Sequence, residues 1–327
     1  MKLATLKNAS RDGELVVVNK ALTAYVSAKP IAPNLQWVIE NWEKCAPLLQ
    51  NKYEELNSNF KDGYPLNIDE LNSPLPRAYQ WLDGSAYLSH VERVRKARGA
   101  EMPPSFLTDP LMYQGGSDFF LGPRDNIVVS DESFGIDFES EVAIITDDTP
   151  MGTNSEKASS HIKLLMLVND VSLRNLIPNE LAKGFGFLHG KPPTTFSPVA
   201  ITPDELGKHW IDDKVHLPLL THYNKSLFGS PNTGVDMQFS FAELIAHAAK
   251  TRPLMAGTII GSGTISNKDL STGCSCFAEK RVLEIIENGE AKTPFMHYGD
   301  TVKIEMLDEQ GKSIFGAIEQ EVIPCQN

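Results

Sequence analysis

The segment from Gly135 to Ile145 constrains the fold and the chemistry of this chain more than any other segment. Polar and apolar residues alternate along it, which is typical of a half-buried β-strand. Side chains two positions apart on a strand point to the same side, so Glu139 and Glu141 are expected to share a face. Burying two unpartnered carboxylates is costly, and a hard divalent cation with oxygen ligands removes that cost. The alternative is a strand face whose carboxylates are solvated or paired with basic side chains.

Composition and charge limit the class of protein. The chain has 327 residues, of which 41% are apolar and 22% charged, and this length predicts a main domain with a smaller one. The net charge of −12 argues against nucleic acid as a partner, because an acidic chain repels phosphate backbones. No apolar run reaches membrane-spanning length, and the first residues lack the apolar core of a signal peptide. We therefore expect a cytoplasmic protein that does not bind a membrane.

The four cysteines are few and irregularly placed, which agrees with a reducing compartment. Cys274 and Cys276 have the spacing of half a metal site, but no matching second pair occurs in the sequence. We expect both to be small residues on a buried strand.

Residues 1–76 have the pattern of a small, β-rich N-terminal lobe with a helix. Strands are predicted at 2–7, 14–18 and 23–28, with a hairpin turn between the first two. Apolar residues between Leu35 and Leu49 recur at helical spacing, and Pro47 is expected to kink or divide that helix. Linker-like segments rich in Pro, Gly, Asn and Ser place the domain boundary after residue 76. The lobe has no acid, base and anion-binding group at motif spacing, so we expect it to supply structure and not chemistry.

Residues 77–327 alternate short apolar strands with turns rich in Gly and Pro, so the expected fold class is α+β and mainly β. Ser240 and Glu243 form a capping box for one clear helix that ends near Lys250. Three late strands are predicted, at 283–286, 301–306 and 314–318.

A second polar group follows the apolar segment 161–168, which ends in Asn169-Asp170. This places a carboxylate at the end of a buried strand. If the chain turned helical there, Arg174 would lie one turn on, where it could pair with Asp170 or grip a substrate carboxylate. Gly and Pro residues make a tight loop that holds Lys191 and Thr195, and a lysine beside carboxylates can bind an anionic oxygen. In isolation, Lys191 and Thr195 would more often be surface groups.

These motifs together resemble the fumarylacetoacetate hydrolase family, over about residue 78 to the C-terminus. The segments that carry the resemblance, in order and spacing, are Glu139-x-Glu141, Asn169-Asp170-Val171-Ser172-x-Arg174, Gly190-Lys191, Gly261-Ser262-Gly263-Thr264-Ile265-Ser266 and Tyr298-Gly299-Asp300-Thr301-Val302. The resemblance implies a mixed β-roll fold. It also implies a divalent cation, Mg²⁺ or Ca²⁺, with these carboxylate ligands: Asp83, Glu139, Glu141 and Asp170.

The resemblance also assigns an acid–base pair. Asp83 lies seven residues before His90, which is the spacing between a metal ligand and the catalytic base in the hydrolase branch of the family. His90 is therefore the expected general base, and Glu279, expected on a late strand, is the carboxylate that orients it. Glu284 is a second candidate for that carboxylate, and a salt bridge from Glu279 to a neighbouring basic residue is the alternative.

Substrate contacts of the family transfer less evenly. The expected substrate-binding residues are Arg98, Tyr113, Arg174, Thr195 and Thr264, with Lys191 as a catalytic cation. Ser85 and Leu181 stand where the family usually has Tyr, and Ile177 stands where it usually has Gln. We therefore expect a substrate with a carboxylate at one end and a less polar far end.

The implied function is metal-dependent hydrolysis of a C–C bond in a β-diketo acid such as fumarylacetoacetate. In this chemistry His90 activates water, and the metal and Lys191 hold the enolate that leaves. Alternatives on the same scaffold are a 2-keto-4-pentenoate hydratase, an acylpyruvase, and a keto-acid decarboxylase or isomerase. A binding protein without turnover is a further alternative, against which the retained metal ligands and base argue. The resemblance also suggests a homodimer.

Overall fold

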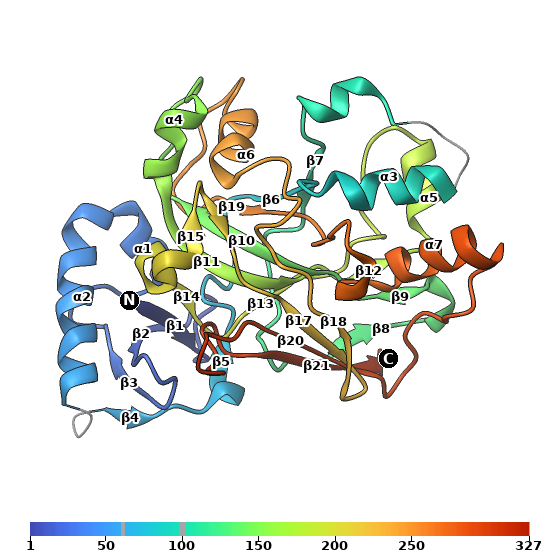
Figure 1. The fold of residues 1–327 in the computed structure, drawn as a ribbon. Helices are drawn as coiled ribbons and strands as arrows, with labels where there is room; N and C mark the ends of the chain where they lie inside the picture. The colour runs from blue at the N-terminus through green and yellow to red at the C-terminus, as the bar shows by residue number, and fades with distance from the viewer. Residues whose placement is uncertain (60–62, 98–101, 327) are drawn as a thin grey trace.

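The computed structural model describes residues 1–59, 63–97 and 102–326 (Figure 1). The helices are α1 (Leu35–Glu40), α2 (Trp42–Ser58), α3 (Leu88–Ala97), α4 (Ser155–Ala158), α5 (Ile177–Ala182), α6 (Phe241–Ala248) and α7 (Phe277–Asn288). The strands of the N-terminal part and of the region up to residue 146 are β1 (Lys2–Leu6), β2 (Glu14–Val18), β3 (Ala24–Ser27), β4 (Tyr64–Pro65), β5 (Leu71–Asn72), β6 (Trp81–Gly84), β7 (Met112–Gly115), β8 (Ile127–Val129), β9 (Ile136–Asp137) and β10 (Ser140–Thr146). The later strands are β11 (Ile162–Asn169), β12 (Ser172–Leu173), β13 (Thr195–Phe196), β14 (Ala200–Ile201), β15 (Trp210–Ile211), β16 (Lys214–Val215), β17 (Leu220–Tyr223), β18 (Ser226–Gly229), β19 (Ile259–Gly261), β20 (Thr301–Glu305) and β21 (Ile318–Pro324).

One large mixed sheet forms the centre of the molecule, in the order β4-β3-β2-β1-β14-β11-β10-β19-β6-β7. Its central strands β10 and β11 are antiparallel, and β19 and β6 run parallel to each other. Successive residues of β10 alternate between two apolar cores, with Val142 and Ile144 in one and Ala143 and Ile145 in the other. The sheet is therefore buried on both faces, because side chains two apart on a strand share a face.

Different layers cover the two faces. Helices α1 and α2 contribute Leu35, Val38 and Leu49 to the same core as Ala143. On the other side lie α6 and the five-stranded sheet β18-β17-β20-β21-β8, whose buried residues join the core of Val142. Figure 1 shows α3 beside α7 at one end of the central strands, and these two helices are in contact. Their position places two helices at the end of the sheet where Asp170 follows β11.

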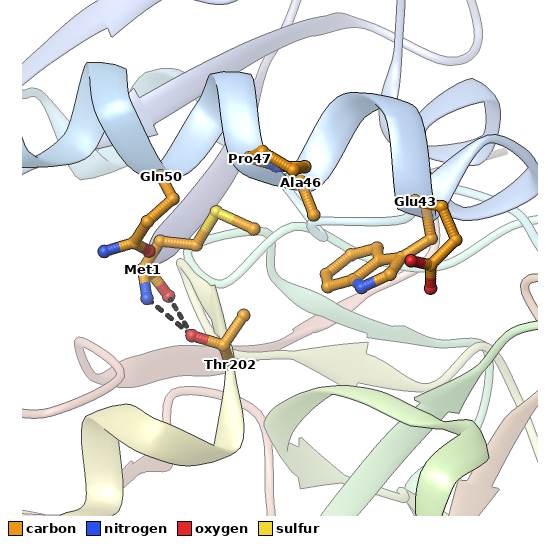
Figure 2. A pocket seen from close by; sticks show the side chains of 7 residues that line it. Met1, Glu43, Ala46, Pro47, Gln50 and Thr202 are labelled. Carbon is orange, nitrogen blue, oxygen red and sulfur yellow. Dashed lines mark hydrogen bonds between the residues drawn. The ribbon is translucent and has the colours of Figure 1, made fainter.

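The N-terminal strands belong to the same sheet as the later ones. Lys2 and Leu3 of β1 pair with Ile201 and Ala200 of β14, which joins residues 1–76 to the rest of the chain by backbone hydrogen bonds. A hollow of about 250 Å³ lies where α2 approaches this junction, and Figure 2 shows the Met1 amino group donating to Thr202 Oγ1 there, at 2.5 Å. The domain boundary after residue 76 stays a prediction.

Several local predictions are confirmed. The strand at Glu14–Val18 has the predicted bounds, and β1 and β2 form the predicted hairpin. The capping box of α6 is present in full: Ser240 Oγ accepts from the Glu243 amide, and the Glu243 carboxylate accepts from the Ser240 amide. The apolar segment 161–168 is the buried strand β11, and Asp170 follows its end.

Other local predictions are wrong. The segment 283–286 belongs to helix α7 and is not a strand, and residues 314–317 precede β21 instead of forming a strand. The helical segment predicted between Leu35 and Leu49 divides into α1 and α2 at Asn41. Pro47, which was expected to kink or divide it, lies inside α2. Cys274 and Cys276 are buried, as expected, but Cys276 is the N-cap of α7 and neither lies on a strand. The glutamate-bearing strand is buried on both faces, and it is interrupted at residues 138–139 between β9 and β10.

Across the described ranges, no helix combines the length and the apolar character needed to cross a membrane.

Candidate active site

Asp83 is brought into the middle of the sheet by β6. It pairs with Gly261 of the parallel strand β19 and with Tyr113 of the antiparallel strand β7. A Cβ at Gly261 would lie 2.4 Å from Asp83 Oδ1, so the carboxylate needs a glycine at this position. Asp83 Oδ1 also accepts a hydrogen bond from the Gly263 amide at 3.1 Å. The glycines of the segment 261–263 therefore let the sheet hold a carboxylate against its backbone.

Glu141 lies on β10, and Asp170 directly follows the neighbouring strand β11. Both are completely buried. Together with Asp83 they form a group in which one carboxylate oxygen from each residue lies within 4.8 Å of the others. Asp83, at 6% exposure, is the member that lines a cavity.

Asp170 has three side-chain partners. Thr194 Oγ1 donates to its Oδ1 at 2.7 Å, and both the Tyr113 hydroxyl and Lys191 Nζ donate to its Oδ2 at 2.5 Å. Glu141 differs, because neither of its buried carboxylate oxygens has a hydrogen-bond partner among the described residues. A buried carboxylate without donors requires a cation or a proton.

Burial and neighbouring charges shift the pKa values of the site carboxylates in different directions. Burial, together with the charge of Asp170, raises the pKa of Asp83 well above its usual value. Burial and the charge of Asp83 raise the pKa of Glu141 in the same way. Burial would also raise the pKa of Glu139, but Arg174 and Lys191 outweigh it and lower that pKa.

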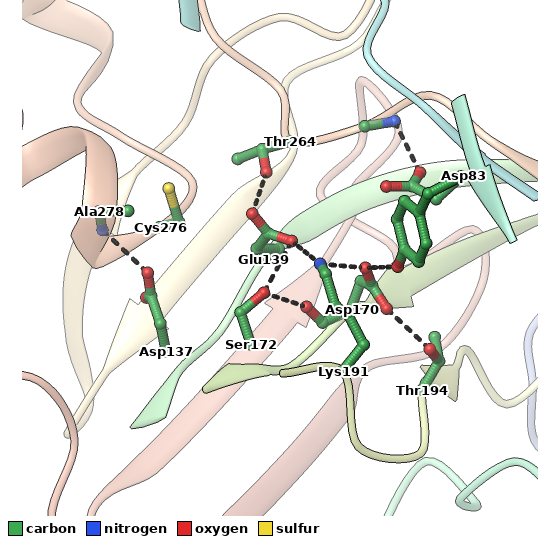
Figure 3. A network of polar contacts seen from close by, with 12 residues as sticks. Asp83, Asp137, Glu139, Asp170, Ser172, Lys191, Thr194, Thr264, Cys276 and Ala278 are labelled. Atoms are coloured by element: carbon green, nitrogen blue, oxygen red, sulfur yellow. Dashed lines mark hydrogen bonds and ion pairs between the residues drawn. The ribbon is translucent and has the colours of Figure 1, made fainter. Parts of the chain in front are cut away.

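Glu139 is the hub of a set of charged and hydroxyl contacts (Figure 3). Arg174 Nη2 and Thr264 Oγ1 donate to its Oε1 at 2.7 and 2.8 Å, and Lys191 Nζ donates to its Oε2 at 2.6 Å. Lys191 also reaches Asp170, so it bridges two carboxylates. Burial alone would lower the pKa of Lys191, but the charges of Asp170 and Glu139 raise it, so this lysine is cationic at neutral pH.

Arg174 has a different neighbour from the one considered in the sequence. The chain does not turn helical after Asp170 but forms the short strand β12, and Arg174 pairs with Asp137 and Glu139. Its Nε donates to Asp137 Oδ2 at 2.8 Å. The pairing with Asp170 is therefore wrong. The second interpretation, that Arg174 grips a substrate, stays a prediction.

Glu279 lies on α7, so its predicted place on a late strand is wrong. Its Oε1 accepts from Ser266 Oγ at 2.6 Å and from Arg93 Nη1, and Arg93 comes from α3. This partner replaces the salt bridge to a neighbouring basic residue that was the alternative. Glu284 lies further along α7, where it binds the 292–293 backbone and Thr293.

Two predicted site residues fall where the structure gives no side-chain information. His90 belongs to helix α3, but its side chain lies outside the described part of the chain. Arg98 lies outside the described residues altogether. Their roles stay predictions.

A cavity of about 390 Å³ opens beside the carboxylates. Its polar side carries Asp83, Glu139, Arg174, Lys191 and Thr264. The lining residues with apolar side chains are Leu111, Met112, Ile177, Leu181 and Phe187. Tyr113 lies between the two kinds of surface, with its ring against Phe187 in an edge-on contact and its hydroxyl on Asp170.

Thr195, which was expected to bind substrate, and the adjacent Thr194 have different surroundings. Thr195 is completely buried on β13, where its hydroxyl accepts from Gln320 Nε2 at 2.9 Å, and it is not among the described residues that line the cavity. Thr194 is the residue that contacts Asp170. Asp137, Arg93 and Phe187 are residues of the site that the sequence motifs did not indicate. For Asp137 the available signal was an acidic residue two positions before Glu139.

The donor set fits a hard divalent cation. Three carboxylates converge, they are buried, and both oxygens of Glu141 are without hydrogen-bond donors from the described residues. Oxygen ligands of this kind suit Mg²⁺, Ca²⁺ and Mn²⁺. Glu139 is the predicted ligand that lies outside this group, and its oxygens are instead bonded to Arg174, Lys191 and Thr264.

The fold and the site together define a class: a mixed, sheet-dominated α+β protein with a buried carboxylate cluster that opens on a small-molecule cavity. The chain belongs to the fumarylacetoacetate hydrolase family. The family profile described as "Fumarylacetoacetate (FAA) hydrolase C-terminal" matches residues 80–323, and the profile "Fumarylacetoacetase N-terminal domain 2" matches residues 1–77. The resemblance found in the sequence is thereby confirmed.

Curated relatives have different activities. The chain is 30% identical over 160 residues to the 2,4-didehydro-3-deoxy-L-rhamnonate hydrolase of Sphingomonas sp. (strain SKA58), with 48% of this chain and 53% of that protein covered. It is 29% identical over 206 residues to an oxaloacetate tautomerase of Bacillus subtilis (strain 168), with 62% and 64% covered. The chain therefore spans between about half and two thirds of the length of these relatives.

Solved structures show the same fold. The fumarylacetoacetate hydrolase from Exiguobacterium antarcticum has a TM-score of 0.69 at 16% identity and covers 99% of this chain and 100% of its own. The maleylpyruvate hydrolase from Sphingobium sp. SYK-6, crystallised with manganese(II) and pyruvate, has a TM-score of 0.65 at 17% identity and covers 100% of both chains. The expected mixed fold with an N-terminal lobe is confirmed by these neighbours.

Proposed function

We propose that this protein is a divalent-metal-dependent hydrolase that cleaves a C–C bond of a β-diketo acid. The observation that carries the proposal is the buried cluster of Asp83, Glu141 and Asp170 beside a cavity that also contains Lys191. Asp83, Glu141 and Asp170 would hold the cation, with Glu139 beside them. When bound, the cation would supply Lewis-acid polarisation of the substrate oxygens. Mg²⁺ and Ca²⁺ are the proposed ions, and the manganese in the maleylpyruvate hydrolase makes Mn²⁺ a useful probe.

The protein groups divide the remaining work. His90 takes a proton from water, whose oxygen then bonds to one substrate carbonyl carbon. Glu279 orients the imidazole and stabilises its cationic form. The C–C bond breaks with its electron pair on the departing carbon, and Lys191 donates hydrogen bonds to the oxygen over which that charge spreads. Return of the proton gives a carboxylic acid and a shorter ketone or keto acid.

The cavity walls support a substrate with an apolar far end. The three positions at which the sequence departs from the family pattern, Ser85, Ile177 and Leu181, all line the cavity. Among the described lining residues the cations are Arg174 and Lys191, and both are already bonded to carboxylates of the protein. These walls favour an acylpyruvate-like acid with one carboxylate over a substrate with a second carboxylate at the far end.

The test of the proposed base is His90→Ala. We expect kcat on an acylpyruvate to fall at least ~10²-fold, the usual scale of a lost general base. The affinity for Mn²⁺, measured by calorimetry, should stay within about threefold of wild type because none of the three clustered carboxylates changes. His297→Ala is the matched control, since its ring pairs with Glu132 on the surface and does not line the cavity. Near-normal kcat in His90→Ala would place the base elsewhere.

A second candidate is keto–enol tautomerisation of an oxo acid, which the oxaloacetate tautomerases among the curated relatives favour. That reaction moves a proton and breaks no C–C bond. The two candidates are separated by identifying the products, because only hydrolysis yields two shorter acids from an acylpyruvate. A homodimer stays an expectation, which light scattering would check.

A further inference from the structure

Asp137 is a buried acid that the chemistry above does not use. It lies on β9, two residues before Glu139, and is completely buried. Its Oδ1 accepts from the Phe277 amide at 2.7 Å, and its Oδ2 accepts from the Ala278 amide at 2.8 Å and from Arg174 Nε, also at 2.8 Å. Figure 3 shows this carboxylate between the start of α7 and the network around Glu139. One side chain thus touches Arg174 and the start of α7, which lies 140 residues beyond Asp137 in the sequence.

The contact with α7 holds the first turn of that helix. Phe277 and Ala278 are the first two residues of α7, and their amides have no partner within the helix itself. The N-cap residue, Cys276, offers a thiol that accepts from the Glu279 amide at 3.4 Å, which is a weak acceptor. An anion near a helix N-terminus is favourable in addition, because it complements the helix dipole. Asp137 therefore supplies most of the capping of α7 from a distant strand.

Glu279 is the next residue of the same turn. Its carboxylate is bonded to Ser266 and to Arg93 of α3, the helix that also contains His90. The direction in which Glu279 leaves the backbone depends on the first turn of α7, which Asp137 fixes. A change at Asp137 would consequently alter the placement of the carboxylate that acts on the proposed base.

The other contact of Asp137 leads to the carboxylate cluster. Arg174 bonds Asp137 through Nε and Glu139 through Nη2, so its planar guanidinium joins the two acids at fixed spacing. Burial alone would lower the pKa of Arg174, but Glu139 and Asp137 raise it, so the guanidinium stays cationic between the two carboxyl groups. Burial raises the pKa of Asp137, against the opposing charge of Arg174.

We propose that Asp137 is a positioning residue that fixes helix α7, and with it Glu279, relative to Glu139 through the Arg174 bridge. This inference rests on the proposed function, because it assumes that Glu279 serves the base. It assigns no contact between Asp137 and substrate or metal. In this proposal its effect on turnover passes through Glu279, and not through Arg174, which also contacts Asp137 and lines the cavity.

A double-mutant cycle tests that route. In Asp137→Asn the side-chain volume is nearly unchanged, but one acceptor oxygen is replaced by an NH₂ group. Part of the set of donors, the Phe277 and Ala278 amides and Arg174 Nε, therefore loses its acceptor, and α7 loses part of its cap. We expect kcat to fall about 30-fold with KM within about threefold, which is less than the ~10²-fold or more that the loss of a general base costs, because the base is misplaced and not removed. In a Glu279→Gln background the same substitution should change kcat less than about threefold, since the group through which it acts is already lost. Equal factors in both backgrounds would overturn the proposal.

Two further measurements do not depend on turnover. Hydrogen–deuterium exchange at the Phe277 and Ala278 amides should become at least about 10-fold faster in Asp137→Asn, and the Mn²⁺ affinity should change less than about threefold. The matched control is Ser240→Ala, which removes the cap of α6 and should speed exchange at Glu243 but not at α7. Unchanged exchange at Phe277 and Ala278 would overturn the proposal whatever the kinetics show.

The exchange experiment also separates the two hypotheses. If wild-type protein turned over no β-diketo acid, the proposed function would fail, and faster exchange at α7 in Asp137→Asn would still establish that Asp137 holds the helix. If wild-type protein is active and exchange is unchanged, the positioning role fails and the proposed function stands.

Discussion

Two glutamates that differ by two positions have opposite surroundings. Glu139 is a paired anion, bonded to Arg174, Lys191 and Thr264. Glu141 is completely buried and has no hydrogen-bond donor for either oxygen among the described residues. Glu139 therefore orders the cations of the site, while Glu141 is the carboxylate that most needs a metal ion.

This difference gives a prediction for Glu141→Gln. Metal affinity should fall at least ~10-fold, because even outer-shell partners of metal ligands are worth ~10–100-fold. The metal-free protein should become more stable by about 1–3 kcal/mol, the scale of an unsatisfied buried polar group, since the amide removes the buried charge. Calorimetric titration with Mn²⁺ and urea unfolding after EDTA treatment check the two parts. Glu54→Gln on the exposed side of α2 is the control, and a variant that binds Mn²⁺ as wild type does would contradict the assignment.

Single residues also show what the sequence could and could not predict. Asp83, Glu141 and Asp170 are three of the four predicted ligands, and each follows from strand alternation or from a spacing that the family shares; the fourth, Glu139, lies outside the cluster. The complete burial of Thr195 on β13 could not be predicted, because a shift of one residue on a strand moves a side chain to the other face. The partner of Arg174 was missed for a related reason, since Asp137 approaches it only after β9 and β12 have paired.

Leu181 allows a test of substrate preference. It is half exposed on α5 and lines the cavity where the family usually has Tyr. We expect Leu181→Tyr to raise kcat/KM for fumarylacetoacetate relative to a long-tailed acylpyruvate by about 10-fold, because a hydroxyl at the far end offers a partner for a polar group. Steady-state kinetics with both substrates measure the ratio. A ratio equal to that of wild type would show that this wall does not choose the substrate.

At the scale of elements, local signals predicted some boundaries and long-range contacts set others. The α6 helix begins where its capping box lies in the sequence, because both partners are within three residues of each other. The α7 helix was mistaken for a strand at 283–286, since its start is fixed by Asp137, far away in the chain, and by the sulfur of Cys276. Asp137 lies outside any local pattern, and cysteine is not among the residues that usually mark a helix N-cap.

Strand β1 contains a lysine whose burial predicts a pH effect. Lys2 is 3% exposed and donates to the Ile314 carbonyl at 2.6 Å, and burial lowers its pKa to about 8. Between the folded pKa near 8 and the unfolded value of 10.5, the unfolded chain binds more protons than the folded one. Stability from this residue is therefore low at neutral pH and rises with pH across that window, by up to about 1 kcal/mol per pH unit.

The prediction is read as a difference between variants. We expect the free energy of unfolding of wild type to rise relative to that of Lys2→Met between about pH 8 and pH 10, as measured by urea unfolding at several pH values. Lys29→Met, at an exposed position and not among the charges that act on Lys2, should follow wild type. Parallel pH profiles for wild type and Lys2→Met would show that burial does not perturb this lysine.

At the scale of the whole molecule, one sheet joins the N-terminal strands to the carboxylate cluster. The sequence predicted the strands β1 and β2 and their hairpin. The pairing of β1 with β14 joins residues about 200 positions apart, so no local sequence pattern predicts it. The three clustered carboxylates come from β6, from β10 and from the end of β11, so none of them belongs to residues 1–76. Residues 1–76 contribute strands to the sheet and apolar side chains to the cores. The prediction of the β-roll and of the carboxylate cluster depended on the family resemblance, not on periodicity.

The central claim is that the carboxylate cluster supports hydrolysis of a C–C bond. The most direct test is to incubate metal-loaded protein with an acylpyruvate in H₂¹⁸O and to identify the products by mass spectrometry. We expect pyruvate and a carboxylic acid that carries ¹⁸O from water, with turnover lost in EDTA and in Glu141→Gln but kept in Glu54→Gln. Recovery of the substrate as its keto or enol tautomer alone, or an equal rate of cleavage in EDTA, would contradict the account.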